Sequence, residues 1–369
     1  MTTALALFID PPSHHFLGDR LFDPGVARLG GENLLAPHIA VRDRLAERGI
    51  AVHTLDGLVR HRAERNLVIS LGRTEGAEQV EGDPSVVRSA FIAMECPIVE
   101  PSIYHALPRM ARLYRRIYSW TGGPELLPFT RTPVEPTRFW WPQSFDAVRD
   151  DLWGRTDRGF LAMVNANKLP RIYDRELYTQ RLRAVAYFHQ FGEIALFGKG
   201  WHRMPMRVGR TWVPATLRRW QGKAWPYWQR MRPNPLYTAA AAATLGPVDS
   251  KLEALSGYRF ALCFENMALK GWMTEKMFDC LCAGTVPVYW GATDVEEWVD
   301  PACFIDMRSL GTFEELRRFL KAVSPEQLTR YRAAGRDFLA SRRFDRFRIA
   351  AWVERIVSIV QEDGGRALS

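Results

Sequence analysis

Residues Phe264–Gly291, FENMALKGWMTEKMFDCLCAGTVPVYWG, contain the end of a strand, a loop, a helix and a second strand in one run. The apolar residues that precede Glu265 indicate a buried strand, and Thr274 is a good N-cap for a helix that Gly284 ends. The apolar run Val286–Trp290 follows at once as another strand. The stretch therefore predicts a strand–helix–strand unit, the building block of a parallel sheet covered by helices.

The start of this helix is also the most suggestive position for chemistry. A helix N-terminus presents unpaired N–H groups and the positive end of a dipole, which suits a diphosphate. Lys276 adds a formal charge there, next to Glu275. Taken alone, the pattern is equally typical of an ordinary capped helix with solvated charges.

The same alternation extends on both sides of this stretch. Strands are expected at 160–164, 194–197, 258–264 and 303–305, and a helix that opens at Asp174 is expected to end at Gly192. Closer to the N-terminus, strands are expected at 4–9, 51–54, 66–71 and 89–94, with a helix capped by Asn33 and another at 104–113. A full apolar stripe predicts a C-terminal helix over 349–360.

Between Gly122 and Trp153 the alternation gives way to a segment rich in Pro, Trp and Phe, where we place a domain junction. The expected organisation is an N-terminal domain over 1–145, a second domain over 155–345 and a terminal helix over 346–369. Two doubly wound, Rossmann-like domains facing a cleft are the simplest α/β architecture for this pattern, and such sheets bind ligands at the carboxyl ends of their strands.

The net charge of +9 is concentrated in one segment. Residues 201–248 contain no Asp or Glu but hold eight basic residues and five tryptophans, so the rest of the chain carries only about +1. This insert is consistent with contact to an anionic membrane, binding of an anionic or lipid-linked acceptor, packing against another subunit, or a structural elaboration with buried indoles. The tryptophans are Trp201, Trp212, Trp220, Trp225 and Trp228.

The remaining bulk features indicate a cytoplasmic protein. No apolar run approaches the ~20 residues that a bilayer requires, and the start of the chain lacks the basic flank and cleavage site of a signal peptide. The cysteines lie inside apolar runs and are odd in number, which favours buried thiols over a disulfide framework or a metal cluster. They are Cys96, Cys263, Cys280, Cys282 and Cys303.

Several motifs together resemble one family. The pattern FEN…TEK…AGTVPVYWG, with YRFALCFEN before it and WVDPACFIDM after it, is similar to the donor motif of the α1,3-fucosyltransferases. DRGFLAMVNAN and RLRAVAYFHQFGEIALFGKGW resemble the first strand, helix and second strand of that family's donor domain. In the N-terminal half, ENLLAPHIAVRDRLAERGIAVHTLDGL and AFIAMECP resemble its acceptor-side domain, with Cys96 where Ser is usual. The likeness covers most of residues 30–345 outside the insert.

The resemblance implies a two-domain GT-B fold and transfer of L-fucose from GDP-fucose to a glycan hydroxyl, with inversion. It implies Glu95 as the general base and Glu275 as the carboxylate near the sugar ring. Arg183 and Lys276 match the residues that bind the donor diphosphate. Such roles are chemically sound, because inversion needs a base for the acceptor proton and a departing diphosphate needs positive charge. No Asp-x-Asp motif occurs in the sequence, which agrees with a metal-independent reaction without a cofactor.

Four further residues are expected to line the donor site. Asn266 matches the asparagine of the family's donor motif, and Glu265 and Thr274 stand beside it in the same motif. Trp272 stands where most members have Tyr, so a different GDP-deoxysugar is an alternative donor. Taken singly, Glu95 is also consistent with a helix cap, and Arg183 and Lys276 with surface charges.

Two alternatives belong to other classes. A nucleic-acid-binding protein is suggested by the basic, aromatic insert alone, and it leaves the FEN…TEK motif unexplained. A catalytically silent, membrane-associated scaffold is disfavoured by the presence of Glu95, Arg183 and Lys276. The expected partners are therefore a GDP-sugar and a glycan acceptor, with peripheral contact to the inner face of the cytoplasmic membrane through 201–248 and no nucleic acid.

Overall fold

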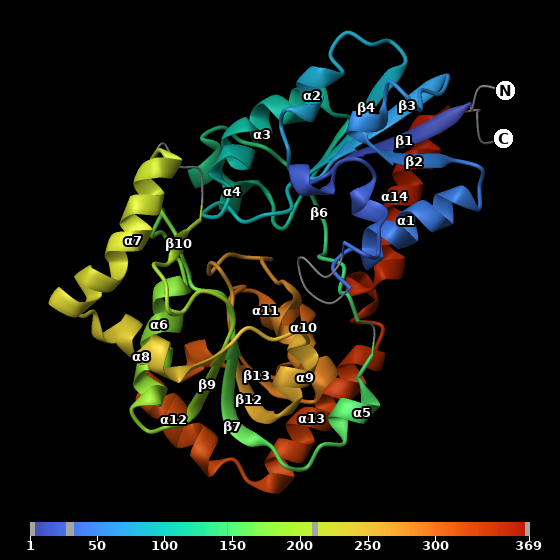
Figure 1. The fold of residues 1–369 in the computed structure, drawn as a ribbon. Coiled ribbons are helices and arrows are strands. Elements are labelled where there is room, and N and C mark those ends of the chain that lie inside the picture. The colour runs from blue at the N-terminus through green and yellow to red at the C-terminus, as the bar shows by residue number, and fades with distance from the viewer. Residues whose placement is uncertain (1–3, 27–32, 146, 209–212, 366–369) are drawn as a thin grey trace. The chain divides into compact units, whose positions relative to one another are not determined.

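The computed structural model describes residues 4–26, 33–145, 147–208 and 213–365 (Figure 1). The chain forms two compact units, one of residues 1–144 and 345–369 and the other of residues 145–344. The expected α/β class is confirmed, because each unit is built on a six-stranded sheet whose strand pairings are all parallel.

The first sheet has the strand order β2-β1-β3-β4-β5-β6. Its strands are β1 (Leu5–Asp10), β2 (Ala51–Thr54), β3 (Arg65–Ser70), β4 (Val86–Ile92), β5 (Arg116–Ser119) and β6 (Thr137–Arg138). The helices of this unit are α1 (Ala36–Ala46), α2 (Gly76–Gln79), α3 (Pro101–Leu113), α4 (Gly123–Thr130) and α14 (Ile349–Gly364). All of β1 is buried, as expected for a central parallel strand with helices on both faces.

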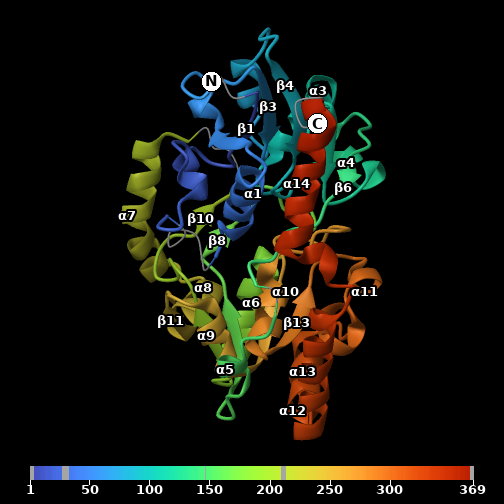
Figure 2. The same ribbon diagram turned by 90° about the vertical axis from the view of Figure 1, so that its right-hand side faces the viewer.

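The C-terminal helix α14 belongs to the first unit, although it follows the second in sequence (Figure 2). It packs against α1, β3 and β4 with the apolar stripe predicted from its sequence, of which Trp352, Val353 and Ile356 are buried. Arg115 and Arg116 hold its last turn through ion pairs of 2.8 and 2.7 Å with the buried carboxylate of Asp363.

The second sheet has the strand order β11-β9-β7-β12-β13-β14. Its strands are β7 (Gly159–Val164), β9 (Ile194–Phe197), β11 (Thr244–Gly246), β12 (Tyr258–Phe264), β13 (Val286–Trp290) and β14 (Ile305–Asp306). A separate two-stranded sheet in the same unit pairs β8 (Lys168–Leu169) with β10 (Met206–Arg207). The helices are α5 (Asp150–Trp153), α6 (Tyr178–His189), α7 (Ala215–Met231), α8 (Pro235–Ala243), α9 (Lys251–Ser256), α10 (Glu275–Ala283), α11 (Val295–Trp298), α12 (Phe313–Ala322) and α13 (Pro325–Ala340).

Several expected element boundaries are wrong. The strand expected at 89–94 and the helix expected at 104–113 correspond to β4 and α3, and each begins three residues earlier than expected. Helix α1 begins at Ala36 and not at Asn33, because Asn33 adopts a left-handed φ of 55° in a turn and Pro37 stands in the first helical turn. Helix α6 begins at Tyr178 and not at Asp174, because the residues between them are hydrogen-bonded to the loop after β12. Residues Pro301–Cys303 form a 3₁₀ turn, so the expected strand at 303–305 is reduced to β14.

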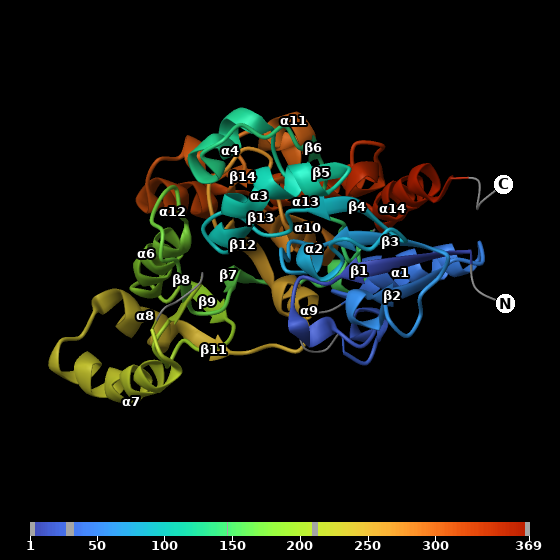
Figure 3. The same ribbon diagram turned by 90° about the horizontal axis from the view of Figure 1, so that it is seen from above.

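The basic insert folds as β10, α7, α8 and β11 at one edge of the second unit (Figure 3). Of its five tryptophans, Trp201 is buried and donates its indole N–H to the carbonyl of Asn165 at 2.8 Å, whereas Trp220 and Trp228 are exposed. Trp212 and Arg210 lie outside the described residues. Within the described part of the chain, no helix combines the length and the apolar character that are needed to cross a bilayer.

Candidate functional site

The connectivity of the second sheet identifies where a ligand would bind. From β7 the chain adds β9 and β11 on one side, and from β12 it adds β13 and β14 on the other. The order therefore reverses between β7 and β12, and the carboxyl ends of strands at such a reversal form the usual ligand crevice of an open α/β sheet. At β12 this end carries Glu265 and Asn266. The motif singled out in the sequence thus lies at the switch point of its sheet.

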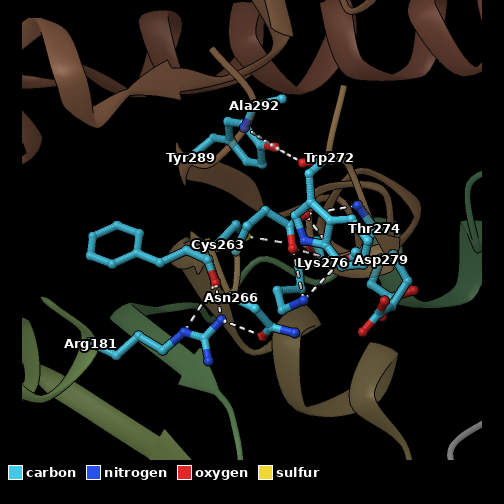
Figure 4. A network of polar contacts seen from close by, with 12 residues as sticks. Arg181, Cys263, Asn266, Trp272, Thr274, Lys276, Asp279, Tyr289 and Ala292 are labelled. Carbon is cyan, nitrogen blue, oxygen red and sulfur yellow. Dashed lines mark hydrogen bonds and ion pairs between the residues drawn. The ribbon is translucent and has the colours of Figure 1, made fainter. Parts of the chain in front are cut away.

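Glu265 organises the start of helix α10, where Thr274 and Lys276 lie (Figure 4). Its carboxylate is completely buried and accepts hydrogen bonds from the Thr274 amide at 2.8 Å, from the Thr274 hydroxyl at 2.8 Å and from the Lys276 ammonium at 2.9 Å. Gly291 leaves room for the Glu265 side chain and for the Tyr289 hydroxyl, since a Cβ at Gly291 would lie 2.5 Å from Cγ of Glu265 and closer still to that hydroxyl oxygen. Glu265 therefore holds the two residues that flank the helix N-terminus and is itself withdrawn from solvent.

Lys276 is the fixed positive charge at this terminus. Its Nζ also donates to the Thr274 hydroxyl at 2.7 Å, and its side chain is 16% exposed. Burial acts to lower the pKa of Lys276, but the carboxylates of Glu265 and Glu275 outweigh burial and raise it above its ordinary value. The ammonium is therefore charged at neutral pH and held at the positive end of the α10 dipole.

Glu275 has a second cationic neighbour that the sequence reasoning missed. Lys251, the first residue of α9, lies 3.4 Å from Glu275 and 3.6 Å from Asp279, which stand one turn apart on α10. Burial acts to raise the pKa of Glu275, but Lys276 and Lys251 outweigh it and hold that pKa well below its ordinary value. Glu275 is therefore a carboxylate whose ionisation is secured from two sides. Glu275 and Asp279 are four residues apart and so lie on one face of α10. That spacing was the sequence signal that one cation could contact both carboxylates.

The arginine that reaches this site is Arg181 and not Arg183. Arg181 is buried on α6 and donates to the carbonyl of Phe264 at 2.6 Å and to Oδ1 of Asn266 at 3.1 Å (Figure 4). Arg183 is exposed on the same helix. Two residues along a helix are separated by about 200° of rotation, so the two side chains leave opposite faces. The structure therefore does not bring Arg183 together with Lys276.

The loop after β12 is tied to the segment before α6. The Leu177 amide donates to the carbonyl of Asn266 at 3.1 Å, and the Ala268 amide donates to the carbonyl of Arg175 at 2.8 Å. Glu176 and Met267 form an antiparallel bridge between the two segments. These bonds, together with the left-handed φ of 51° at Arg175, keep residues 175–177 out of the helix, which is why α6 begins at Tyr178 and not at Asp174. They also fix the position of Asn266 at the carboxyl edge of the sheet.

Trp272 is completely buried within this loop. Its carbonyl accepts a hydrogen bond of 3.3 Å from the hydroxyl of Tyr289, and that hydroxyl accepts one of 3.0 Å from the Ala292 amide. The indole therefore contributes to the core under the Glu265–Thr274 loop. Its contact with a donor sugar stays a prediction.

Glu95 belongs to the first unit. It follows β4 at the carboxyl edge of that sheet, is half-buried, and its carbonyl accepts a 2.5 Å hydrogen bond from the buried hydroxyl of Tyr104 on α3. The same edge carries Asp10, a buried carboxyl that lies 3.1 Å from Arg73. Burial raises the pKa of Asp10 to about 6, against the lowering effect of Arg73. Of these two acids, Glu95 is the one with a solvent-accessible side.

Metal ligands do not gather anywhere in the described ranges, where no group of three or more His, Cys, Asp or Glu side chains could hold an ion. The five cysteines, all of them among the described residues, are buried thiols that form no disulfide. Cys263 of β12 and Cys280 of α10 lie with their sulfur atoms 3.2 Å apart and help to pack the strand against the helix.

Comparison with known proteins points to one family for the second unit. Residues 236–336 match the C-terminal domain of glycosyltransferase family 10 (fucosyltransferase). The chain is 38% identical over 73 residues to an α-(1,4)-fucosyltransferase of Arabidopsis thaliana, covering 20% of this chain and 18% of that protein. It is 39% identical over 79 residues to the α-(1,3)-fucosyltransferase FucT of Helicobacter pylori, covering 21% and 16%. These matches thus span less than a fifth of the length of the two relatives.

A longer match extends over 157 residues to α-(1,3)-fucosyltransferase 7 of Rattus norvegicus, with 32% identity and 40% of each protein covered. Among solved structures, an α,α-trehalose 6-phosphate synthase of Burkholderia multivorans superposes with a TM-score of 0.56 at 10% identity, over the whole of both chains. A glycosyltransferase of Rickettsia africae superposes with a TM-score of 0.54 at 7% identity, over 99% of this chain and 100% of that one.

The structural matches show the fold and the sequence matches show the resemblance. The family match over 236–336 includes the switch point, where the FEN and TEK residues meet at the N-terminus of α10. The chain has the GT-B fold of two Rossmann-like units, and its second unit resembles the C-terminal domain of the family 10 fucosyltransferases.

Proposed function

We propose that this chain is an inverting, metal-independent glycosyltransferase that transfers L-fucose from GDP-fucose to a hydroxyl group of a glycan acceptor. The observation that carries the proposal is the Lys276 ammonium, fixed by Glu265 at the N-terminus of α10 and at the switch point of the sheet. A diphosphate is the ligand that a fixed ammonium and free helical N–H groups bind well. The choice of fucose as the transferred sugar rests on the sequence relatives, which are named as fucosyltransferases.

The reaction assigns a task to each group. The acceptor oxygen attacks the anomeric carbon opposite GDP, its proton passes to the Glu95 carboxylate, and the bond from that carbon to the diphosphate oxygen breaks. Lys276 and Arg181 stabilise the charge that develops on the departing diphosphate. Glu275, kept ionised by Lys251 and Lys276, stabilises the positive charge of an oxocarbenium-like transition state. Asn266, oriented by Arg181, faces the donor.

The proposal extends to place and acceptor. The absence of acidic residues from 201–248 supports an acceptor that is anionic or lipid-linked. Protein glycosylation and the synthesis of a surface polysaccharide, carried out in the cytoplasm at the inner face of the membrane, are the two kinds of process that such an acceptor serves.

Another GDP-deoxysugar is the second candidate donor. Trp272 favours it, because the indole brings no phenolic hydroxyl to the place where the family usually has tyrosine. A site that hydrogen-bonds a sugar hydroxyl discriminates strongly, whereas an apolar wall does so weakly. Competition between GDP-fucose, GDP-mannose and other GDP-deoxysugars, expressed as ratios of kcat/KM, decides between the donors.

A thermal-shift experiment with GDP, GMP, UDP and short oligonucleotides tests the function most directly. GDP at about 100 times its Kd should stabilise the native state by about 2.7 kcal/mol and so raise the melting temperature. Stabilisation by oligonucleotides without any by GDP would indicate the nucleic-acid-binding alternative. Turnover of GDP-fucose against a panel of glycans then identifies the acceptor.

Treatment with a chelator should leave turnover unchanged. The departing charge has protein cations for its stabilisation in Lys276 and Arg181, so the proposed reaction does not require a divalent ion. The rate is measured after dialysis against EDTA, with and without added Mg²⁺ or Mn²⁺. A strict dependence on either ion would refute the metal-independent mechanism.

Arg181→Ala should weaken GDP binding by about 10- to 100-fold, because a hydrogen bond to a charged group contributes about 1.5–3 kcal/mol. Arg183→Ala is the matched control. Arg183 lies two residues after Arg181 and is exposed, so the variant removes the same charge at a position outside the site. Calorimetric titration of both variants with GDP compares them. Loss of affinity in the Arg183 variant alone would restore the assignment made from sequence and remove Arg181 from the site.

A further inference from the structure

Helix α7 has an unusual degree of exposure for an ordered helix. It spans Ala215–Met231, and none of its residues is buried. The helix lies at the outer edge of the second unit, beyond α8 (Figures 1 and 3). A helix of this length normally buries one face to be stable. The exposed faces of α7 therefore call for an explanation.

One face of α7 is apolar and open to solvent. Its large side chains are 43% to 80% exposed. They follow one another at intervals of three, seven, one and three residues, which places all of them within about 100° on a helical projection. They are Leu217, Trp220, Tyr227, Trp228 and Met231.

A basic stripe runs along one side of this apolar face. Arg219, Lys223 and Arg230 are exposed, and their spacing of four and seven residues puts them on one line of the helix. No acidic residue occurs anywhere in 201–248. The stripe consequently has no carboxylate within the insert to neutralise it.

The opposite side of the apolar face fastens the helix to the protein. Trp225 packs edge-to-face on Tyr237 of α8, with ring centroids 5.4 Å apart. Helix α8 in turn packs on α6 through its inner face, where Ala240 and Ala243 are buried. The attachment of α7 through Trp225 leaves both the apolar face and the basic stripe pointing away from the unit.

We infer that α7 docks onto an anionic lipid surface, with its axis in the plane of the membrane and its indoles at the headgroup level. An apolar face with Trp and Tyr beside a row of Arg and Lys is the pattern of helices that lie in that interface. The basic stripe adds attraction to anionic headgroups.

Charge disfavours the main competing occupant, which is a second copy of this chain. A second copy docked through the same patch would bring two basic stripes together without a carboxylate on either side, because the insert has none. A lipid surface supplies both the apolar layer and the negative charge. The inference rests on the proposed function in one respect, since a lipid-linked acceptor would explain why a glycosyltransferase needs such a helix.

Co-sedimentation with vesicles tests the docking. The whole chain should bind vesicles of phosphatidylcholine and phosphatidylserine at low salt, bind pure phosphatidylcholine weakly, and be released as salt rises. Arg219→Gln/Lys223→Gln/Arg230→Gln should weaken partitioning by about 100-fold, at about fivefold for each basic residue removed near the surface. Trp220→Ser/Trp228→Ser should also weaken it, with no change of charge.

The matched control removes three exposed basic residues elsewhere, in Arg318→Gln/Arg330→Gln/Arg342→Gln. It has the same net charge as the stripe variant and should partition like the wild type. Equal loss in the control, or no binding by the wild type at low salt, overturns the inference. Sedimentation velocity provides the other decisive outcome: a wild-type dimer that the Trp220→Ser/Trp228→Ser variant converts to monomer assigns the face to a second copy instead.

Failure of this inference can be separated from failure of the proposed function. The melting-temperature shift with GDP should be the same in the wild type, the stripe variant and the control, because α7 lies outside the donor site. Vesicle binding without a GDP shift retains the docking helix and rejects the transferase, whereas a GDP shift without vesicle binding does the reverse.

Discussion

Glu95→Gln should lower the rate of sugar transfer by about 10²- to 10⁴-fold, the usual effect of losing a general base. The replacement keeps the size and the hydrogen-bonding capacity of the side chain but cannot accept the acceptor proton. The backbone at this position is fixed independently, through the hydrogen bond from Tyr104 to the Glu95 carbonyl. The fold should therefore survive, and the GDP affinity should not change, because Glu95 is in the first unit and the diphosphate residues are in the second.

Glu100→Gln is the matched control for this variant. Glu100 lies five residues further along the same segment, at the N-cap of α3, and its replacement causes the same change of charge. The two variants are compared by kcat at saturating donor and by calorimetric GDP affinity. If Glu95→Gln turned over at the wild-type rate, the base would have to be another residue, and Asp10 at the same edge of the sheet would be tested next.

The local periodicity of the sequence was enough to predict most of the second sheet. The strand 258–264, the helix start after Thr274 and the strand 286–290 all occur where the pattern placed them. Each of these elements is defined by its own apolar residues and by a nearby cap or glycine. The GT-B fold followed from the resemblance, and the superpositions confirm it.

What the sequence could not predict depends on contacts between distant residues. The cap expected at Asp174 is wrong because residues 175–177 pair with a loop almost a hundred residues away. The apolar stripe of α14 predicted a buried face, but its place in the first unit also depends on ion pairs of its Asp363 with Arg115 and Arg116, which lie 248 and 247 residues earlier in the chain. Periodicity carries no information about such partners.

The candidate site shows the same division at the level of single residues. Motif resemblance brought Glu265, Thr274, Glu275 and Lys276 together correctly as neighbours, since they share one strand end and one helix start. It selected Arg183 over Arg181, because the distance along the chain does not determine which side of α6 faces the loop. It also gave no role to Lys251, whose contact with Glu275 crosses between two helices.

Lys276 is the residue whose removal should affect both binding and stability. Lys276→Met should weaken GDP binding by about 10- to 100-fold, for the loss of a charge-assisted interaction of about 1.5–3 kcal/mol. It should also destabilise the fold, because Glu265 would be left buried without its ammonium, and breaking a buried ion pair in this way costs about 3–5 kcal/mol. A simple loss of GDP binding in this variant could therefore reflect partial unfolding.

The double variant Lys276→Met/Glu265→Gln separates the two effects. It removes both charges, and the carboxamide oxygen that replaces the carboxylate can still accept hydrogen bonds from Thr274, so the free energy of unfolding should return most of the way to that of the wild type. GDP affinity should stay as low as in Lys276→Met, because the cation that faces the diphosphate is still missing. Urea unfolding and calorimetric titration with GDP measure the two quantities on the same samples. Recovery of GDP affinity together with stability would mean that Lys276 only neutralises Glu265, and the diphosphate would then have to be bound by other groups at the N-terminus of α10.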